Sequence, residues 1–162
     1  MPTTKNKKFK DKIKSHKSLS RLMAIQIFYQ HNFFNDKSDL EKIKNDLIEN
    51  YALQEDEVVS SYRDKIDENL LNNLLLGLSM NVKKIDEEIA SFLRDDQKIS
   101  ALENVMLQIL RLAAFEIKFL LDVPIKVVID EYVGIAASFF DATKVTFVNA
   151  LIDGMAKKNV RN

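Results

Sequence analysis

The chain has 162 residues, and its 24 basic and 24 acidic side chains give a formal net charge of zero. This length suits one domain, and a content of 46% hydrophobic and 30% charged residues excludes a wholly disordered chain. Three glycines and two prolines are too few for the turns of a β-sandwich or for a glycine-rich phosphate loop. With no cysteine and two histidines, the sequence predicts no disulfide, metal site or cofactor. An all-α domain is the class that remains.

The charge is unevenly divided along the chain. Residues 1–21 hold eight basic side chains and one acidic side chain, a net of +7, which leaves −7 on the rest. We predict a flexible basic arm over residues 1–16 and a single helical domain over 17–162. Lysine-rich arms bind polyanions because each neutralised phosphate releases condensed counterions. The alternatives are a solvated tail without a ligand and an anionic membrane, which Phe9 and Ile13 alone do not favour.

No segment of the sequence indicates export or membrane insertion. The apolar runs are all shorter than the ~20 residues of a membrane span. The lysine-rich start also lacks the apolar core of a signal peptide. The sequence therefore predicts a cytoplasmic protein with no membrane partner.

Apolar residues recur with helical spacing along most of the domain. The first expected helix covers residues 18–32, with Ser18 or Ser20 as its cap. A helix over 38–50 and a loop with a helical turn over 53–61 are expected next, followed by a long helix over 63–93 that could be two helices meeting near 77–81. After a polar connection over 94–100, the helix over 102–121 is the most apolar of the chain, so we expect it at the centre of the fold. The last two expected helices are one after Pro124 and one over 144–157. About seven helices with short connections predict a compact bundle.

Catalytic signatures are absent from the sequence. It contains no nucleophile elbow, phosphate loop or zinc-protease motif. Adjacent acids such as Asp95 and Asp96 are typical of a solvated helix face, and His16 lies among lysines, where a buried general base cannot be arranged. We therefore predict that the protein is not an enzyme.

Polar residues interrupt two apolar helices. Glu116 lies in the central helix, where an unpaired carboxylate would cost several kcal/mol, so we expect a structural polar contact there. In the last helix, Phe147 and Asn149 could stack on a nucleic-acid base and read its edge. Packing of Phe147 in the core is the alternative.

Three segments resemble motifs of the NusB family of bacterial transcription antitermination factors, in the family's order and nearly its spacing. The first is the opening helix SRLMAIQIFYQ at Ser20–Gln30, and the second is NLLLGLSMN at Asn73–Asn81. The third comprises LRLAAFEI, DVPIKVVIDE and FVNALID. The resemblance covers about residues 18–158.

The resemblance implies two small helical sub-bundles and a role without catalysis. Members of the family pair with the small-subunit ribosomal protein that serves as NusE. Together they bind the boxA element of nascent RNA, mainly in ribosomal RNA transcripts, and load RNA polymerase for antitermination. Carried over by position and joined to the lysine arm, the expected RNA-binding residues are Lys10, Lys12, Lys14, Lys17, Arg21, Phe147 and Asn149, and the expected partner-binding residue is Tyr29.

The chain also departs from the family pattern. The family's dense arginine run is here KSLSR at Lys17–Arg21, and the charge lies in the lysine arm upstream. Lysine lacks the planar fork of arginine, so we expect less base-specific contacts. Thr146 replaces a frequent lysine, and Ala150 and Phe140 replace glycines. Two other functions remain open: the NusB-like domain of a ribosomal RNA cytosine methyltransferase fragment, and a helical adaptor that binds protein alone.

Overall fold

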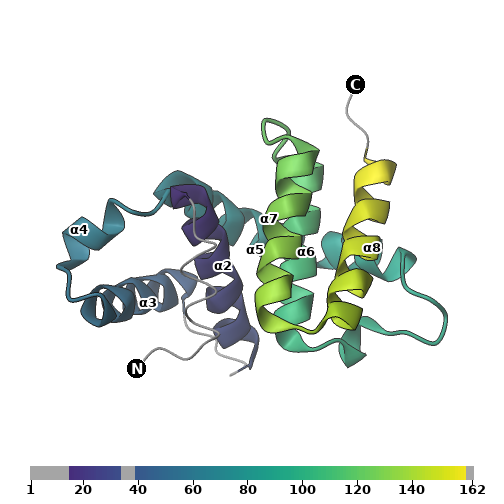
Figure 1. Ribbon diagram of the computed structural model, residues 1–162, viewed down its shortest axis with the longest axis horizontal. Helices are drawn as coiled ribbons and strands as arrows, with labels where there is room; N and C mark the ends of the chain where they lie inside the picture. Colours follow the sequence, from purple (N-terminus) through teal and green to yellow (C-terminus); the bar gives the residue numbers. More distant parts are fainter. Residues whose placement is uncertain (1–14, 34–38, 160–162) are drawn as a thin grey trace.

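The computed structural model of the chain describes residues 15–33 and 39–159 (Figure 1). Within these residues there is no strand, and the all-α expectation is confirmed. The helices are α2 (His16–Phe33), α3 (Leu40–Gln54), α4 (Val59–Arg63), α5 (Glu68–Ser91), the 3₁₀ helix η1 (Ile99–Ala101), α6 (Asn104–Phe119), α7 (Ile125–Phe139) and α8 (Ala142–Lys158).

The helices form two groups that share α5. Figure 1 shows α2, α3 and α4 on one side of the molecule and α6, α7 and α8 on the other. Helix α5 packs against α2 in the first group and against α6 and α8 in the second. The expectation of two small sub-bundles is therefore confirmed.

Helix α6 is the centre of the fold, as its apolar sequence predicts. It packs against α2, α5, α7 and α8. Residues 106–110 and 112–117 are buried, so nearly every face of the helix lies against another helix. This burial includes the polar side chains of Gln108 and Glu116, which therefore need internal partners.

Of the two possibilities left open for the long helix, the structure has the unbroken one, because α5 runs without interruption from Glu68 to Ser91. Gly77 lies against the ring of Phe115 on α6. A Cβ atom at position 77 would lie 2.1 Å from Cζ of Phe115, far inside van der Waals contact. The glycine thus provides room for an aromatic ring from another helix and does not end its own helix.

Some helix ends also differ from the predicted bounds. Helix α2 begins at His16, one residue inside the predicted arm, and the Oγ atom of Ser15 accepts the backbone N–H of Ser18 at 3.1 Å. Ser15 therefore caps α2, in place of Ser18 or Ser20. Helix α5 begins at Glu68 and not at residue 63, because the Asp67 carboxylate caps it by accepting the backbone N–H of Leu70 at 3.0 Å.

Candidate nucleic-acid interface

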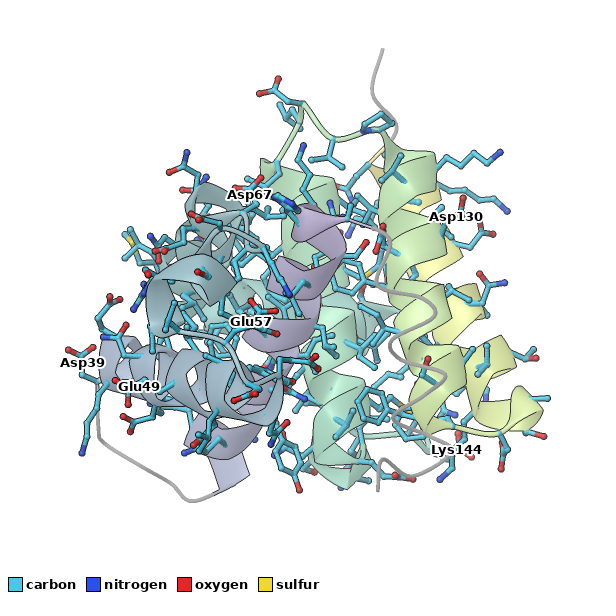
Figure 2. All side chains as sticks on the ribbon, turned by 60° about the vertical axis from the view of Figure 1, so that its left-hand side comes forward. Asp39, Glu49, Glu57, Asp67, Asp130 and Lys144 are labelled. Carbon is cyan, nitrogen blue, oxygen red and sulfur yellow. The ribbon has the colours of Figure 1, made fainter. Side chains whose placement is uncertain are left out.

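The expected RNA-binding lysines fall into two sets. Lys10, Lys12 and Lys14 lie outside the described residues. Lys17 is exposed in the first turn of α2, where the described part of the chain begins. Figure 2 shows the acidic side chains Asp39 and Glu49 beside α3, well separated from Lys144 at the start of α8. Of the four expected RNA-binding lysines, Lys17 is therefore the one whose position the structure describes.

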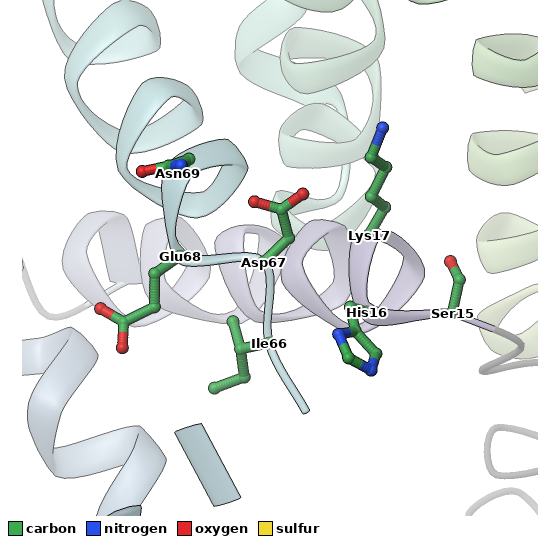
Figure 3. Close-up of a pocket in the computed structure, with 7 residues that line it drawn as sticks. All are labelled: Ser15, His16, Lys17, Ile66, Asp67, Glu68 and Asn69. Atoms are coloured by element: carbon green, nitrogen blue, oxygen red, sulfur yellow. The ribbon is translucent and has the colours of Figure 1, made fainter. Parts of the chain in front are cut away.

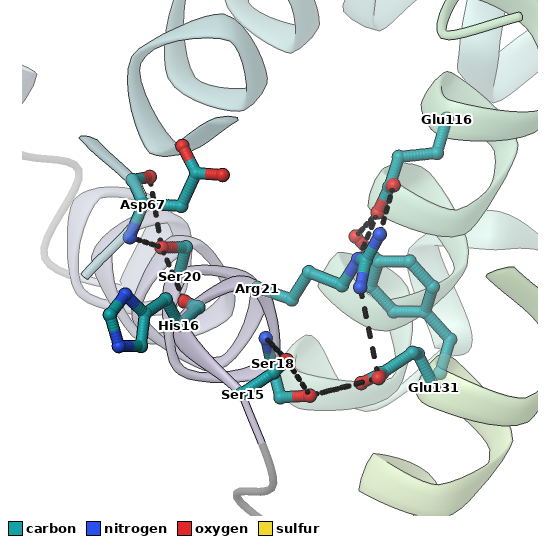
Figure 4. Close-up of polar contacts among 9 residues, drawn as sticks. Ser15, His16, Ser18, Ser20, Arg21, Asp67, Glu116 and Glu131 are labelled. Atoms are coloured by element: carbon teal, nitrogen blue, oxygen red, sulfur yellow. Dashed lines mark hydrogen bonds and ion pairs between the residues drawn. The ribbon is translucent and has the colours of Figure 1, made fainter. Parts of the chain in front are cut away.

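Arg21 does not fit the role predicted for it. Its side chain is 1% exposed and forms a two-pronged ion pair with Glu116, which is 0% exposed. Nε of Arg21 donates to Oε2 at 2.8 Å and Nη2 donates to Oε1 at 2.9 Å (Figure 4). We therefore correct the assignment: the guanidinium has no surface to offer RNA, and it joins α2 to α6.

The ion pair belongs to a larger buried cluster. The hydroxyl of Tyr132 on α7 donates to Glu116, and Nη1 of Arg21 lies 3.8 Å from Oε1 of Glu131. The hydroxyl of Ser18 also lies 2.8 Å from the same carboxylate oxygen of Glu131 (Figure 4). The structural contact expected for Glu116 is thus confirmed, and it ties α2 to both α6 and α7.

The cluster shifts the titration of two of its members. Burial alone would lower the pKa of Arg21, but the hydrogen bonds and negative charge of Glu116 outweigh burial and raise this pKa. Burial, followed by the charge of Glu116 and the hydrogen bond to it, raises the pKa of Tyr132 well above its usual value. Arg21 therefore stays charged and Tyr132 neutral at physiological pH.

An open pocket of about 670 Å³ lies where the N-terminal turns of α2 and α5 meet (Figure 3). Its lining includes Ser15, His16, Lys17, Ile66, Asp67, Glu68 and Asn69. The two turns are joined by Ser20, whose hydroxyl oxygen accepts the backbone N–H of Asp67 at 2.9 Å. Because the carboxylates of Asp67 and Glu68 share the pocket with Lys17, it does not offer a uniformly basic wall to a phosphate.

Phe147 and Asn149 lie in the first half of α8. Phe147 is partly buried and packs against the core, whereas Asn149 is exposed. The ring is thus anchored on one side and reaches solvent on the other. This position combines the two alternatives weighed for it, core packing and an accessible aromatic face.

Tyr29 is exposed near the end of α2, and its backbone carbonyl accepts a hydrogen bond from Nδ2 of Asn104 at 3.2 Å. Asn104 is the first residue of α6, and the preceding residue, Glu103, pairs with Lys144 in the first turn of α8. The structure therefore brings Tyr29 and the start of α8 to the same end of α6.

Lys17 lies toward the opposite end of α6. It precedes Arg21 by about one turn of α2, and Arg21 pairs with Glu116 in the last turn of α6. A helix of 16 residues is about 24 Å long, so the two ends of α6 are separated by roughly that distance. The expected RNA-binding residues are therefore spread over the molecule and do not form one compact patch.

An amide cluster beside Tyr29 was not anticipated from the sequence. Asn32 Nδ2 and Gln108 Nε2 both donate to Oδ1 of Asn104, at 3.1 and 2.8 Å. Oε1 of Gln108 is buried without a hydrogen-bond partner among the described residues. The available signal was the i, i+4 spacing of two amides at the start of the most apolar helix.

Two kinds of feature are missing from the described part of the chain. None of the helices in 15–33 and 39–159 is long and apolar enough to cross a membrane. In the same ranges, no group of three or more His, Asp or Glu side chains is placed to hold a metal ion.

Comparison with known proteins agrees with the sequence motifs. The model of the NusB family matches residues 18–157. The transcription antitermination protein NusB of Allorhizobium ampelinum is 31% identical over 96% of this chain and 95% of its own length. The protein of the same name from Rickettsia akari is 31% identical over 88% of this chain and 92% of its own length.

A solved structure shows the same fold. The structure of T. maritima NusB superposes with a TM-score of 0.68 and 30% sequence identity, and the match covers 87% of this chain and 90% of that one. The family model, the curated relatives and the solved structure thus agree over nearly the whole helical domain. The chain therefore belongs to the NusB family of transcription antitermination factors.

Proposed function

We propose that this protein binds boxA-type single-stranded RNA in nascent transcripts, mainly those of ribosomal RNA, together with the ribosomal protein NusE. The observation that carries the proposal is the arrangement at the Asn104 end of α6. Exposed Tyr29 and the first turn of α8 both lie at this end, and Phe147 and Asn149 follow within the next two turns of α8. A partly exposed ring on the helix that starts at the same end of α6 as an exposed tyrosine suits a site that RNA and a protein partner share.

The basic arm and Lys17 have a separate task in this proposal. Phosphate contacts position a nucleic acid, whereas contacts with the bases give specificity. The lysines therefore supply affinity for any RNA strand, and the Phe147–Asn149 region supplies preference for boxA. The protein acts in the cytoplasm as a component of an antitermination complex with RNA polymerase, without catalysis or a cofactor of its own.

The test is fluorescence anisotropy with a boxA-type RNA and a scrambled RNA, with and without the cognate ribosomal protein. Selective tightening on boxA when the partner is present supports the proposal. Weak and equal binding of both RNAs in both conditions contradicts it and favours the protein-only adaptor.

A pair of variants locates the specificity. Phe147→Ala should weaken boxA binding more than scrambled-RNA binding, because a lost stacking contact costs about 1–3 kcal/mol. Phe119→Ala is the matched control, since Phe119 is an exposed aromatic residue at the other end of α6. Equal losses on both RNAs for Phe147→Ala would assign the ring to the core alone.

A further inference from the structure

The solvent face of α5 carries two large apolar side chains that the core does not use. Leu76 is 65% exposed and Met80 is 75% exposed. They are four residues apart on one helix, so their side chains are neighbours. The opposite face of α5 already supplies the core through Leu71, Leu74 and Leu78, which are fully buried.

An aromatic residue of α6 extends this apolar surface. The ring of Phe119 is 37% exposed and packs against Phe115, with the ring centroids 5.3 Å apart. Phe115 in turn lies on Gly77, between Leu76 and Met80 in the sequence of α5. We call Leu76, Met80 and Phe119 the apolar strip.

The border of the apolar strip is positively charged. Lys84, one turn beyond Met80, places Nζ 5.9 Å from the ring centroid of Phe119, and Lys83 is exposed beside it. Within the described residues, neither lysine has a carboxylate at ion-pair distance. The neighbouring acids Asp86 and Glu88 are paired with Arg111 and Lys118.

Glu87 is the exposed carboxylate on the same face of α5, so two ammonium groups face one acid along this border. Paired lysines beside Leu76 and Met80 are complementary to a partner that presents apolar side chains flanked by carboxylates. An amphipathic helix meets this description, because its apolar residues recur at i, i+4 and i+7.

We infer that the apolar strip is a docking surface for an acidic amphipathic helix of a partner protein. This surface is separate from Tyr29 and from the helix that carries Phe147 and Asn149, because Phe119 ends α6 whereas Tyr29 and the start of α8 lie at its Asn104 end. RNA is a poorer occupant: two of the three side chains are aliphatic and give a base no aromatic ring to stack on.

Met80 makes the test specific to this surface. Of the chain's five methionines, Met23, Met106 and Met155 are buried, and Met1 lies outside the described residues. The ¹³C-methyl NMR signal of Met80 therefore reports contact with the apolar strip. The probe is a synthetic helical peptide with leucines along one stripe and flanking glutamates, and its control carries lysine at every glutamate position.

The acidic peptide should shift the Met80 methyl signal and the basic peptide should not. The double variant Lys83→Glu/Lys84→Glu should weaken the acidic peptide about tenfold, since two exposed charge contacts are removed and replaced by repulsion. Leu76→Ser should also weaken binding, whereas Leu53→Ser, at a 79% exposed leucine of α3, should leave it unchanged.

Three results would overturn the inference: no shift with the acidic peptide, equal shifts with both peptides, or unchanged affinity in the Lys83→Glu/Lys84→Glu variant. A shift of the Met80 methyl on adding boxA-type RNA alone would assign the surface to RNA and also overturn it. The peptide titrations contain no RNA and no ribosomal protein, so their failure leaves the proposed function untouched.

Discussion

At the scale of single residues, the buried cluster around Glu116 is the feature most sensitive to change. Removing Arg21, Glu116 or Tyr132 leaves a charge or a donor without its partner among side chains that are at most 1% exposed. Replacing Arg21, Glu116 and Tyr132 together by apolar side chains of similar volume leaves none of the three groups unpaired. Such a replacement is often neutral or stabilising. Variants of Arg21, Glu116 and Tyr132 therefore separate the structural role of Arg21 from a role in RNA binding.

Arg21→Met should lower the free energy of unfolding by about 3–5 kcal/mol, because the Glu116 carboxylate stays buried without its cation. The triple variant Arg21→Met/Glu116→Leu/Tyr132→Phe should recover most of this loss. Urea unfolding measures both effects. The folded triple variant should also bind RNA like the unmodified protein, and a tenfold loss of RNA affinity would show that the guanidinium contacts RNA after all.

At the scale of helices, the close approach of α5 and α6 at Gly77 overrides intrinsic propensity. Alanine is the better helix former by about 1 kcal/mol, yet Gly77→Ala should lower the free energy of unfolding by about 1–3 kcal/mol, because the ring of Phe115 must move. Gly134→Ala in α7 is the control. Apart from the neighbouring backbone of its own helix, no atom lies within 4 Å of its added Cβ, so this variant should gain about 0.5–1 kcal/mol. If Gly77→Ala stabilises the protein, the ring of Phe115 moves aside without an energetic cost.

A second contact between helices gives a dependence on pH. Glu88 of α5 is buried and accepts hydrogen bonds from Nζ of Lys118 and Nδ2 of Asn159, both at 2.9 Å. Burial raises the pKa of Glu88, but the bonds from Lys118 and Asn159 outweigh it and lower the pKa below the ordinary value of 4.5. A lowered folded-state pKa adds stability above the unfolded-state pKa, and this stability is lost as the pH falls through the folded-state pKa.

Glu88→Gln should therefore cost about 1–2 kcal/mol at pH 7, where the carboxylate is charged. The difference from the unmodified protein should shrink steadily below about pH 4.5, as the carboxylate takes up its proton. Urea unfolding at a series of pH values measures this difference. A cost that stays constant from pH 7 to pH 3 would contradict the role given to the charged pair. Glu87→Gln, at the adjacent exposed acid, is the matched control and should change little at any pH.

Helical periodicity was sufficient to predict most helices, because it depends only on neighbours along the chain. It could not predict contacts between residues that are far apart in the sequence. Gly77 has low helix propensity, which left a break open as an alternative, but a ring 38 positions later fills the space beside it. Arg21 matched a motif arginine, but its partner lies 95 positions away in the sequence. For the same reason the RNA-binding roles of Lys17, Phe147 and Asn149 stay predictions, since each depends on a surface shared with another molecule.

At the scale of the whole molecule, the basic first segment and the acidic remainder set the response to salt. Contact with about six phosphates of a single strand predicts a slope of roughly −4 for log K against log salt concentration. Deleting residues 1–14 should weaken boxA and scrambled RNA about equally and should reduce the slope. Anisotropy titrations at several salt concentrations measure both quantities. A slope near zero for the intact chain would remove the basic arm from the binding site.

The distance in sequence between Arg21 and Glu116 also matters while the protein is being made. Bacterial ribosomes add about 5–20 residues per second, so Glu116 is synthesised roughly 5–20 s after Arg21, which precedes it by 95 positions. During this interval the buried face of α2, with Leu22, Met23 and Ile25, has no α6 to pack against. Arg21 is thus a cation of the nascent chain for several seconds before it becomes part of the interior.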